Sequence, residues 1–411
     1  MKNGWTLGQF LIFRVTFGLY LLYHFLGLLP WGPELFSSRG VLPQGTMSPL
    51  FHLFPNVFLL WDSPLFVQAC LLAAGIFSLF LTIGKFDRVM AILIWYLWAC
   101  FYGRNPLISN PSLPFIGWLL LAYALIPSLS DRKELASTRE DTGPWKMPGD
   151  IFAAAWILMA LAYSYSGYCK LISPSWMDGN ALHHVLNNPL ARDTVVRTSL
   201  LALPAWSLKA ATWTTLFLEL GFAPLALFQR LRPFLWVAMV VLHLGLLALV
   251  NFSDLTIGML MLHFFTFDPA WIPSPKPAGQ PIFYDGHCGL CHGLVRFVLS
   301  EDQSARPFSF APLQGEEIKR SITDSVRAEL PDSVVVVEEN KNALTRSAAV
   351  IYVLKRLGGL WFFSATLLSL VPRTLGDFAY DAMASVRKRI FGTTEEVCPL
   401  VPRPLRARFL N

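Results

Sequence analysis

Charged side chains are scarce in the first part of this 411-residue chain. Lys, Arg, Asp and Glu contribute 30 residues to positions 1–278 and another 30 to the much shorter stretch 279–411. Sparse charge together with 14 tryptophans and a hydrophobic content of 54% indicates a polytopic α-helical membrane domain followed by a soluble one. We therefore predict a membrane domain at 1–268, a stiff proline-rich linker at 269–280 and a soluble α/β domain at 281–411.

Concentrated positive charge is also missing. The formal net charge of +6 is spread over loops and both parts, which argues against the single basic face expected of a nucleic-acid-binding protein. Residues 6–29 lack a small-residue cleavage site, so we expect a membrane span there and not a signal peptide that is removed. The partner expected from the first part is a lipid bilayer.

Eight apolar runs are candidate spans, at residues 6–29, 64–83, 89–102, 113–126, 151–172, 210–228, 231–250 and 255–267. The third, fourth and eighth are short, so some of them could be re-entrant. Lys and Arg are denser in the loops that share a side with the N-terminus, which favours that side as the cytoplasm. An even number of spans then places both termini and the soluble domain at the cytoplasmic face of a bacterial inner membrane.

Ionisable side chains inside predicted spans that draw attention are Arg14, His24, Glu219, His243 and His263. Such groups are costly in a bilayer and indicate either function or a pair that locks helices together, for which Arg14 and Glu219 are candidates. His24 and His263 could each be satisfied by a neighbouring carbonyl. Lys170 ends an apolar helix, where a lysine usually extends to the interface, although apolar surroundings also let a lysine lose its proton and act as a base.

A single Cys-x-x-Cys motif stands near the start of the second part. Cys288 and Cys291 follow a short apolar run, 281–284, that predicts a strand, and a turn at 285–286. Apolar residues at helical spacing then run over 290–299, which puts the first thiol at a helix start, where amides and the helix dipole favour a thiolate. Strand, turn, thiol pair and helix together indicate a thioredoxin-type redox motif.

Three other interpretations of the motif remain open. Residues 288–292 also spell a c-type haem attachment site. Zinc could use His287, Cys288, Cys291 and His292, but four ligands within six residues do not readily surround one ion, and no second Cys-x-x-Cys follows. Two inert buried thiols are the third alternative.

Within the redox interpretation the two thiols have different roles. Cys288 precedes the helix and is the expected attacking thiol, with a lowered pKa to which a protonated His287 would add. Cys291 lies further into the first turn, where we expect it to be better shielded and to resolve the mixed disulfide. Asp285 is assigned a proton-transfer role toward Cys291, with simple turn capping as the alternative.

The second part resembles the DCC family of thiol-disulfide oxidoreductases, whose Asp-x-x-Cys-x-x-Cys signature is matched by Asp285, Cys288 and Cys291. The resemblance continues in order through 295–299, 308–314, 332–337, 345–347 and 352–358. It implies a thioredoxin-like fold and a redox activity toward a protein or peptide thiol or disulfide. Pro331 is the nearest candidate for the cis-proline that flanks the disulfide in thioredoxin.

The first part resembles a second family, the HTTM domain, which includes vitamin K-dependent gamma-carboxylase. The resemblance rests on Arg14, Gly18, the stretch 166–171, Trp176, Gly179, His243 and 257–259. It implies that Lys170 is the base that deprotonates a reduced vitamin K-like quinone, with His243 in support. Two departures count against carboxylation: Arg104-Asn105-Pro106 stands where that enzyme has an Asn-His pair, and its large lumenal domain is missing.

Two functions follow from these resemblances. The first is a membrane-bound thiol-disulfide oxidoreductase, with a quinone-like ligand in the membrane domain as the source or acceptor of electrons. The second is a carboxylase-like enzyme or ligand-binding module centred on Lys170, with the redox domain as its reductant or sensor.

The rest of the second part is expected to be mixed. We predict strands at 308–311 and 333–338, the latter continued in a hairpin, a helix at 316–330, and three closing helices at 347–357, 360–370 and 375–391. Cys398 could act as a further resolving thiol, although a lone cysteine more often has no such role. A basic end, attracted to anionic lipid or simply solvated, is formed by Arg387, Lys388, Arg389, Arg403, Arg406 and Arg408.

Overall fold

The computed structural model of the chain describes residues 1–51, 53–127, 145–272, 279–302, 304, 307–338, 342–392 and 403–410. It divides into two compact units. The first, called here the helical unit, comprises Met1, Ile12–Thr142 and Pro148–Phe267. The second, the sheet unit, comprises Lys2–Leu11, Gly143–Met147 and Asp268–Asn411.

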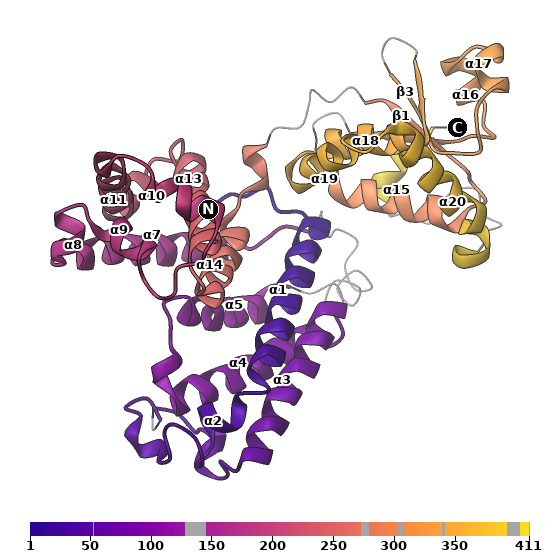
Figure 1. Ribbon diagram of the computed structural model, residues 1–411. Helices are drawn as coiled ribbons and strands as arrows, with labels where there is room; N and C mark the ends of the chain where they lie inside the picture. Colours follow the sequence, from indigo (N-terminus) through magenta and orange to yellow (C-terminus); the bar gives the residue numbers. More distant parts are fainter. Residues whose placement is uncertain are drawn as a thin grey trace. The chain divides into compact units, whose positions relative to one another are not determined.

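Long helices dominate the helical unit (Figure 1). They are α1 (Leu7–Leu28), α3 (Pro64–Ile83), α4 (Asp87–Arg104), α5 (Leu113–Leu125), α7 (Gly149–Leu171), α11 (Ala205–Leu220), α13 (Arg232–Leu249) and α14 (Ser253–Thr266). Shorter α-helices lie between them, at Gly32–Phe36 (α2), Pro174–Met177 (α8), Ala181–Leu186 (α9), Val195–Leu201 (α10) and Phe222–Ala226 (α12). Local signals set their ends: α3, for example, begins at a proline after the capping Ser63 and stops at Gly84, whose φ is 76°.

Four of these helices, α1, α3, α7 and α13, are long and apolar enough to cross a membrane by length and composition. About eight spans, as predicted from the sequence, is therefore not supported. The reason is length and charge. α5 and α14 have 13 and 14 residues, whereas a bilayer core requires about 20. α4 carries Asp87, Arg88 and Arg104 within its 18 residues, and the run 210–228 is divided where α11 ends at Leu220 and the short α12 begins at Phe222.

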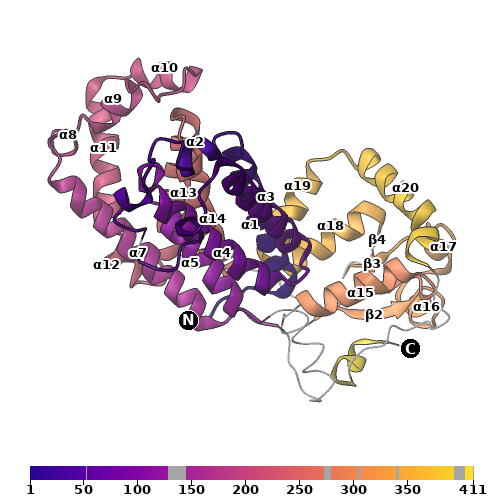
Figure 2. The same cartoon turned by 90° about the horizontal axis from the view of Figure 1, so that it is seen from below.

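The sheet unit contains one four-stranded sheet in the order β2-β1-β3-β4. The strands are β1 (Pro281–Tyr284), β2 (Ser309–Pro312), β3 (Val335–Val337) and β4 (Ala343–Thr345). β1 and β2 run parallel and are joined through helix α15 (Gly289–Glu301), which makes a β-α-β unit. β3 pairs antiparallel with both β1 and β4. Figure 2 labels β2, β3 and β4 beside α15 and α16.

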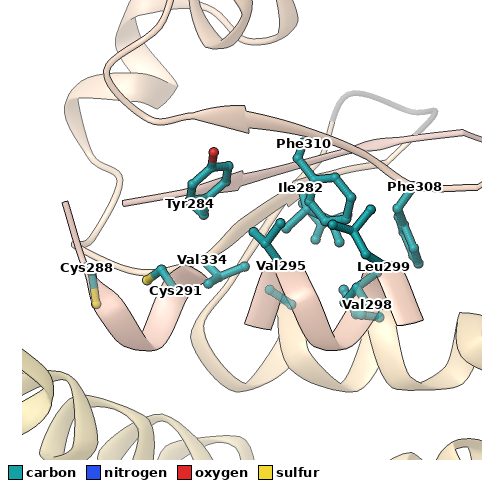
Figure 3. Packing of buried hydrophobic residues seen from close by; sticks show 13 residues of the cluster. Ile282, Tyr284, Cys288, Cys291, Val295, Val298, Leu299, Phe308, Phe310 and Val334 are labelled. Carbon is teal, nitrogen blue, oxygen red and sulfur yellow. The ribbon is translucent and has the colours of Figure 1, made fainter. Parts of the chain in front are cut away.

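Successive strand residues point to opposite faces of the sheet, so each face has its own apolar core. Ile282, Tyr284 and Phe310 face a cluster with Val295 and Val298 of α15, which Figure 3 shows from close by. On the other face, Phe283 and Ala311 pack with Ile318 of helix α16 (Glu317–Ser321). The sheet is therefore covered on both sides, and one of the covering helices is the one that starts at the thiol pair.

Most predicted elements of the second part are confirmed. The predicted strand at 281–284 is β1, and the predicted hairpin is formed by β3 and β4. The three closing helices are α18 (Arg346–Leu357), α19 (Gly359–Ser369) and α20 (Arg373–Phe391). The single helix predicted at 316–330 is wrong: it is divided into α16 and α17 (Asp324–Ala328), because Ile322 and Thr323 adopt extended backbone angles. Half of the predicted linker, at 273–278, lies outside the described residues.

Candidate active site

The two thiols lie where a helix begins. Cys288 is the N-cap residue of α15, with an extended backbone (φ −106°, ψ 119°), and its amide donates to the Asp285 carbonyl at 3.2 Å. Cys291 sits in the first turn, within side-chain hydrogen-bond reach of Cys288. Figure 3 shows both sulfur atoms at the same end of the helix, beyond Tyr284 and Val295. The predicted position of the pair at a helix start is therefore confirmed.

The expected difference in shielding is wrong, because both thiols are buried. Cys288 has 0% of its surface exposed and Cys291 has 4%. The end of α20 accounts for this cover: the amide of Gly289 donates to the carbonyl of Gly392 at 3.2 Å. A Cβ at position 289 would overlap the carbonyl oxygen of Phe391, so only glycine permits this close approach. Sequence periodicity could not reveal that the last helix reaches the first turn of α15.

Asp285 lies in the turn before the thiols and is 6% exposed. Its Oδ1 accepts the amide of His287 at 3.0 Å and the side-chain amide of Gln314 at 3.4 Å. The first bond is the turn-capping arrangement considered above as the simpler alternative. Its Oδ2 accepts from Arg387 Nη2 at 3.3 Å, so the carboxylate also has a charged partner that capping does not require.

Arg387 is the functional-site residue that sequence reasoning misplaced. It was grouped with the solvent-facing basic end, yet it is 2% exposed and lies on α20. Its Nη2 also donates to Asp332 Oδ1 at 2.6 Å, and its Nη1 to the Asp332 carbonyl at 3.3 Å. The amphipathic pattern of 375–391 carried no signal for this, because its apolar residues, among them Leu375, Phe378 and Ile390, are exposed whereas Arg387 is buried.

Arg408 is a second member of the predicted basic end whose side chain bonds to other residues of the sheet unit. It pairs with Asp302 at 2.9 Å and donates to the Phe308 carbonyl at 2.8 Å. Arg389 and Arg406 are exposed, while the side chains of Lys388 and Arg403 are outside the described residues. Two of the six basic groups therefore stabilise the sheet unit and are not available to lipid.

Burial dominates the electrostatics of the resolving thiol. Burial, with a smaller contribution from the neighbouring Cys288, raises the pKa of Cys291 to about 12, although the Arg387 charge and a backbone hydrogen bond from Asp285 act in the opposite direction. Cys291 therefore holds its proton at neutral pH. A reaction in which it becomes a nucleophile needs a group that takes this proton.

A small cavity of about 180 Å³ adjoins the same thiol. Its wall is mostly apolar, and Cys291, Tyr380 and Arg387 supply the polar groups. Tyr380 is held by its hydroxyl, which accepts the amide of Val334 at 2.9 Å. The cavity and the two buried thiols thus lie between α15, β3 and α20.

The remaining candidates near the motif are placed as follows. His287 is exposed, and His292 is buried with Nε2 2.8 Å from the Gly286 carbonyl oxygen. Among the described residues, no three His, Cys, Asp or Glu side chains converge as metal ligands would. Pro331 precedes β3, and no cis peptide bond occurs in the described ranges, so it is not a cis-proline there. Cys398 lies outside the described residues.

In the helical unit, Lys170 is at the end of α7. Its Nζ donates to Ser166 Oγ at 2.9 Å and forms an ion pair with Glu219 of α11, and it lies 4.8 Å from the centre of the Trp176 ring. The alternative pairing of Glu219 with Arg14 is wrong, since Glu219 takes Lys170 as its partner and Arg14 hydrogen-bonds the hydroxyl of Tyr123. Lys170 and Glu219 are 49 residues apart in the sequence.

His243 belongs to a neighbouring polar cluster. Its Nε2 is 2.7 Å from the hydroxyl of Tyr163 on α7, and the same hydroxyl is 3.3 Å from Nε2 of His263. His263 is satisfied by the carbonyl of Met259 at 2.9 Å, as predicted. Nδ1 of His243 is buried and has no hydrogen-bond partner in the described part of the chain. α7 therefore carries Lys170 itself and Tyr163, the hydrogen-bond partner of His243.

His24 is satisfied by a carboxylate and not by a carbonyl, contrary to expectation. Its Nδ1 is 2.7 Å from Asp254 Oδ1, and its Nε2 is 2.8 Å from the Tyr102 hydroxyl. Asp254 Oδ2 accepts from Asn110 at 2.8 Å. Sequence reasoning missed Asp254 because it lies one residue before the predicted span at 255–267.

Comparison with known proteins identifies the sheet unit. The family model of DCC1-like thiol-disulfide oxidoreductases matches residues 282–393. A chloroplastic DCC family protein of Arabidopsis thaliana is 34% identical over 117 residues, which cover 28% of this chain and 67% of that protein. The uncharacterized protein YuxK of Bacillus subtilis is 32% identical over 138 residues, covering 33% of this chain and 98% of that protein. No solved structure gives a significant match, and the resemblance to the HTTM domain has no support from a family model or relative.

Proposed function

Because the chain belongs to the DCC1-like thiol-disulfide oxidoreductase family, we propose that its sheet unit exchanges a dithiol for a disulfide at Cys288 and Cys291. The observation that carries this proposal is the position of Cys288 at the cap of α15 with a second thiol one turn away. The β1-α15-β2 unit and its antiparallel neighbours support a thioredoxin-like fold.

In the reducing direction the reaction has two steps. The Cys288 thiolate attacks one sulfur of a substrate disulfide, so a Cys288–substrate bond forms and the other substrate sulfur leaves as a thiolate that takes up a proton. Cys291 then gives up its proton and attacks Cys288 Sγ, which forms the Cys288–Cys291 disulfide and releases the second substrate thiol. Two electrons pass from the protein dithiol to the substrate, and the oxidising direction is the same sequence reversed.

Two variants test the assignment in the full-length protein purified in detergent, with a glutathionylated peptide as substrate. Cys288→Ser is expected to abolish exchange, whereas Cys291→Ser should accumulate a mixed disulfide on Cys288, detected by peptide mass spectrometry. Cys169→Ser, which changes an exposed cysteine of the helical unit, is the matched control and should behave as the unchanged protein. Turnover by Cys288→Ser would refute the proposal.

The membrane context is part of the proposal. The four candidate spans support an integral membrane protein whose N-terminus and sheet unit are cytoplasmic, because four crossings, like eight, return the chain to its starting side. Single cysteines introduced at residues 131–150 test this in intact cells with an impermeant thiol reagent. Labelling from outside the cell would show that the orientation is wrong.

A quinone-like ligand in the helical unit would accept or supply the two electrons. The chemistry of the residues fits such a ligand, because the buried Nδ1 of His243 has no partner in the described residues and the Tyr163 hydroxyl lies beside it. A neutral His243 could accept a proton from a quinol or, in its other tautomer, donate to a carbonyl oxygen. Organic extraction of the purified protein followed by mass spectrometry tests this, with His243→Phe as the variant expected to lose the ligand.

The carboxylase-like alternative centres on Lys170. The observation that favours a specialised role is its partly buried position beside Glu219 and Ser166 at the end of an apolar helix. Nζ of Lys170 is occupied by this ion pair, so Lys170 would be free to act as a base only after Glu219 is displaced. Proton release from reduced vitamin K, followed optically with the purified protein, should be lost in Lys170→Met and retained in Cys288→Ser if this alternative holds.

A further inference from the structure

Arg387 is a buried positive charge that the redox steps above do not use. Its side chain is 3% exposed and shared between two carboxylates with different surroundings. The Asp285 side chain is 8% exposed, whereas that of Asp332 is 71% exposed. Because water screens the exposed partner, the interaction with Asp285 is the one that depends most on burial. The ion pair of Arg387 with Asp285 is therefore the buried one, and Asp285 belongs to the turn that precedes the thiols.

Arg387 also lies beside the resolving thiol. Both residues line the cavity of about 180 Å³ between α15, β3 and α20, and Nε of the guanidinium has no hydrogen-bond partner in the part of the chain that the structure describes. A cation in an apolar wall acts over a longer distance than the same cation in water. The negative charge that forms on Cys291 during resolution would therefore be stabilised by a group already in place.

We propose that Arg387 is a positioning residue for the second redox step: it holds Asp285 as the proton acceptor for Cys291 and places a positive charge beside the thiolate that results. The proposal rests on the thiol-disulfide function inferred above. In this step Cys291 Sγ attacks Cys288 Sγ and the substrate thiolate leaves. The proton of Cys291 passes to Asp285, directly or through water. No electron passes through Arg387.

The groups around Cys291 support a role for Asp285 as the proton acceptor and for Arg387 as the residue that positions it. The groups that interact with Cys291 are Cys288, the backbone of Asp285, Tyr380 and Arg387. Two further polar groups of this region are His292 of α15 and Asp332 before β3. His292 is occupied by the Gly286 carbonyl and Tyr380 by the Val334 amide. Burial raises the pKa of Tyr380 above its usual value, so it does not supply a base at neutral pH. Asp285 is the buried carboxylate of this set, and Arg387 is its cationic partner.

The two steps can be timed separately with oxidised glutathione as the probe. Reduced full-length protein in detergent is mixed with the probe, quenched with acid at intervals and digested. Mass spectrometry of the peptide that contains both cysteines then measures the Cys288–glutathione adduct and the Cys288–Cys291 disulfide. The first species reports attack and the second reports resolution.

Arg387→Met is expected to slow resolution by about a hundredfold, the lower end of a typical acid–base contribution, so that the adduct accumulates. Raising the pH should reduce this difference, because solvent hydroxide then removes the Cys291 proton. Arg387→Lys keeps the charge and should restore most of the rate. Arg389→Met, a change at an exposed arginine on the same helix, is the matched control and should leave both steps unchanged.

A merely structural role for Arg387 predicts a different result. If the arginine only holds α20 in place, its loss uncovers Cys288, accelerates attack and makes lysine no better than methionine. Asp285→Asn provides an independent variant, because asparagine retains turn capping but cannot accept the proton; it should slow resolution as Arg387→Met does, and the two changes together should be no worse than either alone.

Resolution at the unchanged rate in both Arg387→Met and Asp285→Asn would overturn the proposal. If the unchanged protein itself forms no adduct with glutathione or with the glutathionylated peptide, it is the thiol-disulfide function that fails, and the two failures are thus distinguished.

Discussion

The two units neutralise buried charge in different ways. In the helical unit, Lys170 and Glu219 meet as a closed ion pair, and His24 hydrogen-bonds Asp254 with hydroxyl and amide partners around them. In the sheet unit, Arg387 is divided between two carboxylates and lies beside a thiol and a cavity. A closed pair favours one arrangement of helices, whereas a shared cation can respond when a new negative charge appears. The comparison distinguishes charges that stabilise one arrangement of helices from a charge that is placed to assist a reaction.

The largest expected effect concerns the reactivity of Cys291. With its pKa raised from 9.0 to about 12, its thiolate at neutral pH should be about a thousandfold scarcer than in the unfolded chain, at tenfold per pKa unit. Iodoacetamide alkylation against pH, read by peptide mass spectrometry, should show Cys288 reacting before Cys291 and the rate at Cys291 still rising above pH 9. Equal rates at Cys291 in folded and urea-unfolded protein would contradict this.

The same shift has a consequence for stability, with a definite sign. A thiol whose pKa is raised on folding keeps its proton longer in the folded state, so its contribution is complete below the unfolded value of about 9 and is lost as the pH rises toward about 12. Cys291→Ala should therefore flatten the loss of stability of the protein over this alkaline range.

Breaking the closed pair of the helical unit should have the next largest effect. Lys170→Met leaves Glu219, whose side chain is 6% exposed, without its cation, and should destabilise the protein by about 3 kcal/mol. Glu219→Gln should cost less, because the Lys170 side chain is 20% exposed and can reach water. Thermal unfolding in detergent measures both, and the double variant should be less destabilised than Lys170→Met alone.

The control for that pair is an exposed one. Asp193→Asn removes the partner of Arg197, at 3.6 Å with the Asp193 side chain 95% exposed, and should change stability by less than about 0.5 kcal/mol. A loss from Asp193→Asn as large as that from Lys170→Met would remove the distinction between buried and exposed charge on which this prediction depends.

The contact between the end of α20 and the first turn of α15 can be tested by adding one methyl group at position 289. Gly289→Ala places a Cβ against the Phe391 carbonyl, so α20 must shift, at a cost of about 1–3 kcal/mol. Alkylation of Cys288 should become faster because its cover is displaced. Gly293→Ala, on the same helix with open space around the added Cβ, should instead stabilise α15 by about 0.5–1 kcal/mol.

A small effect is also expected at the exposed partner of Arg387. Asp332→Ala removes a carboxylate whose side chain is 71% exposed, so the loss should stay near 0.5 kcal/mol. Asp285→Ala should cost clearly more, since it leaves a buried guanidinium without its buried counter-charge. Chemical denaturation of both variants compares the two halves of the shared ion pair directly.

The sequence by itself determined the local features of the redox site. A four-residue apolar run followed by Asp-Gly and two cysteines predicted β1, the turn and the start of α15, and the structure confirms them. Periodicity likewise located α18, α19 and α20 within a few residues. These features depend on the conformational preferences of residues close together in the chain, which one sequence contains in full.

Tertiary structure alone decided which side chains meet. Asp285 and Arg387 are 102 residues apart, and His24 and Asp254 are 230 apart. The same packing buried Cys288 and brought the end of α20 to the first turn of α15. Partners of buried charges are set by the packing of distant elements against one another, and the spacing of residues along a helix or strand carries no record of that packing.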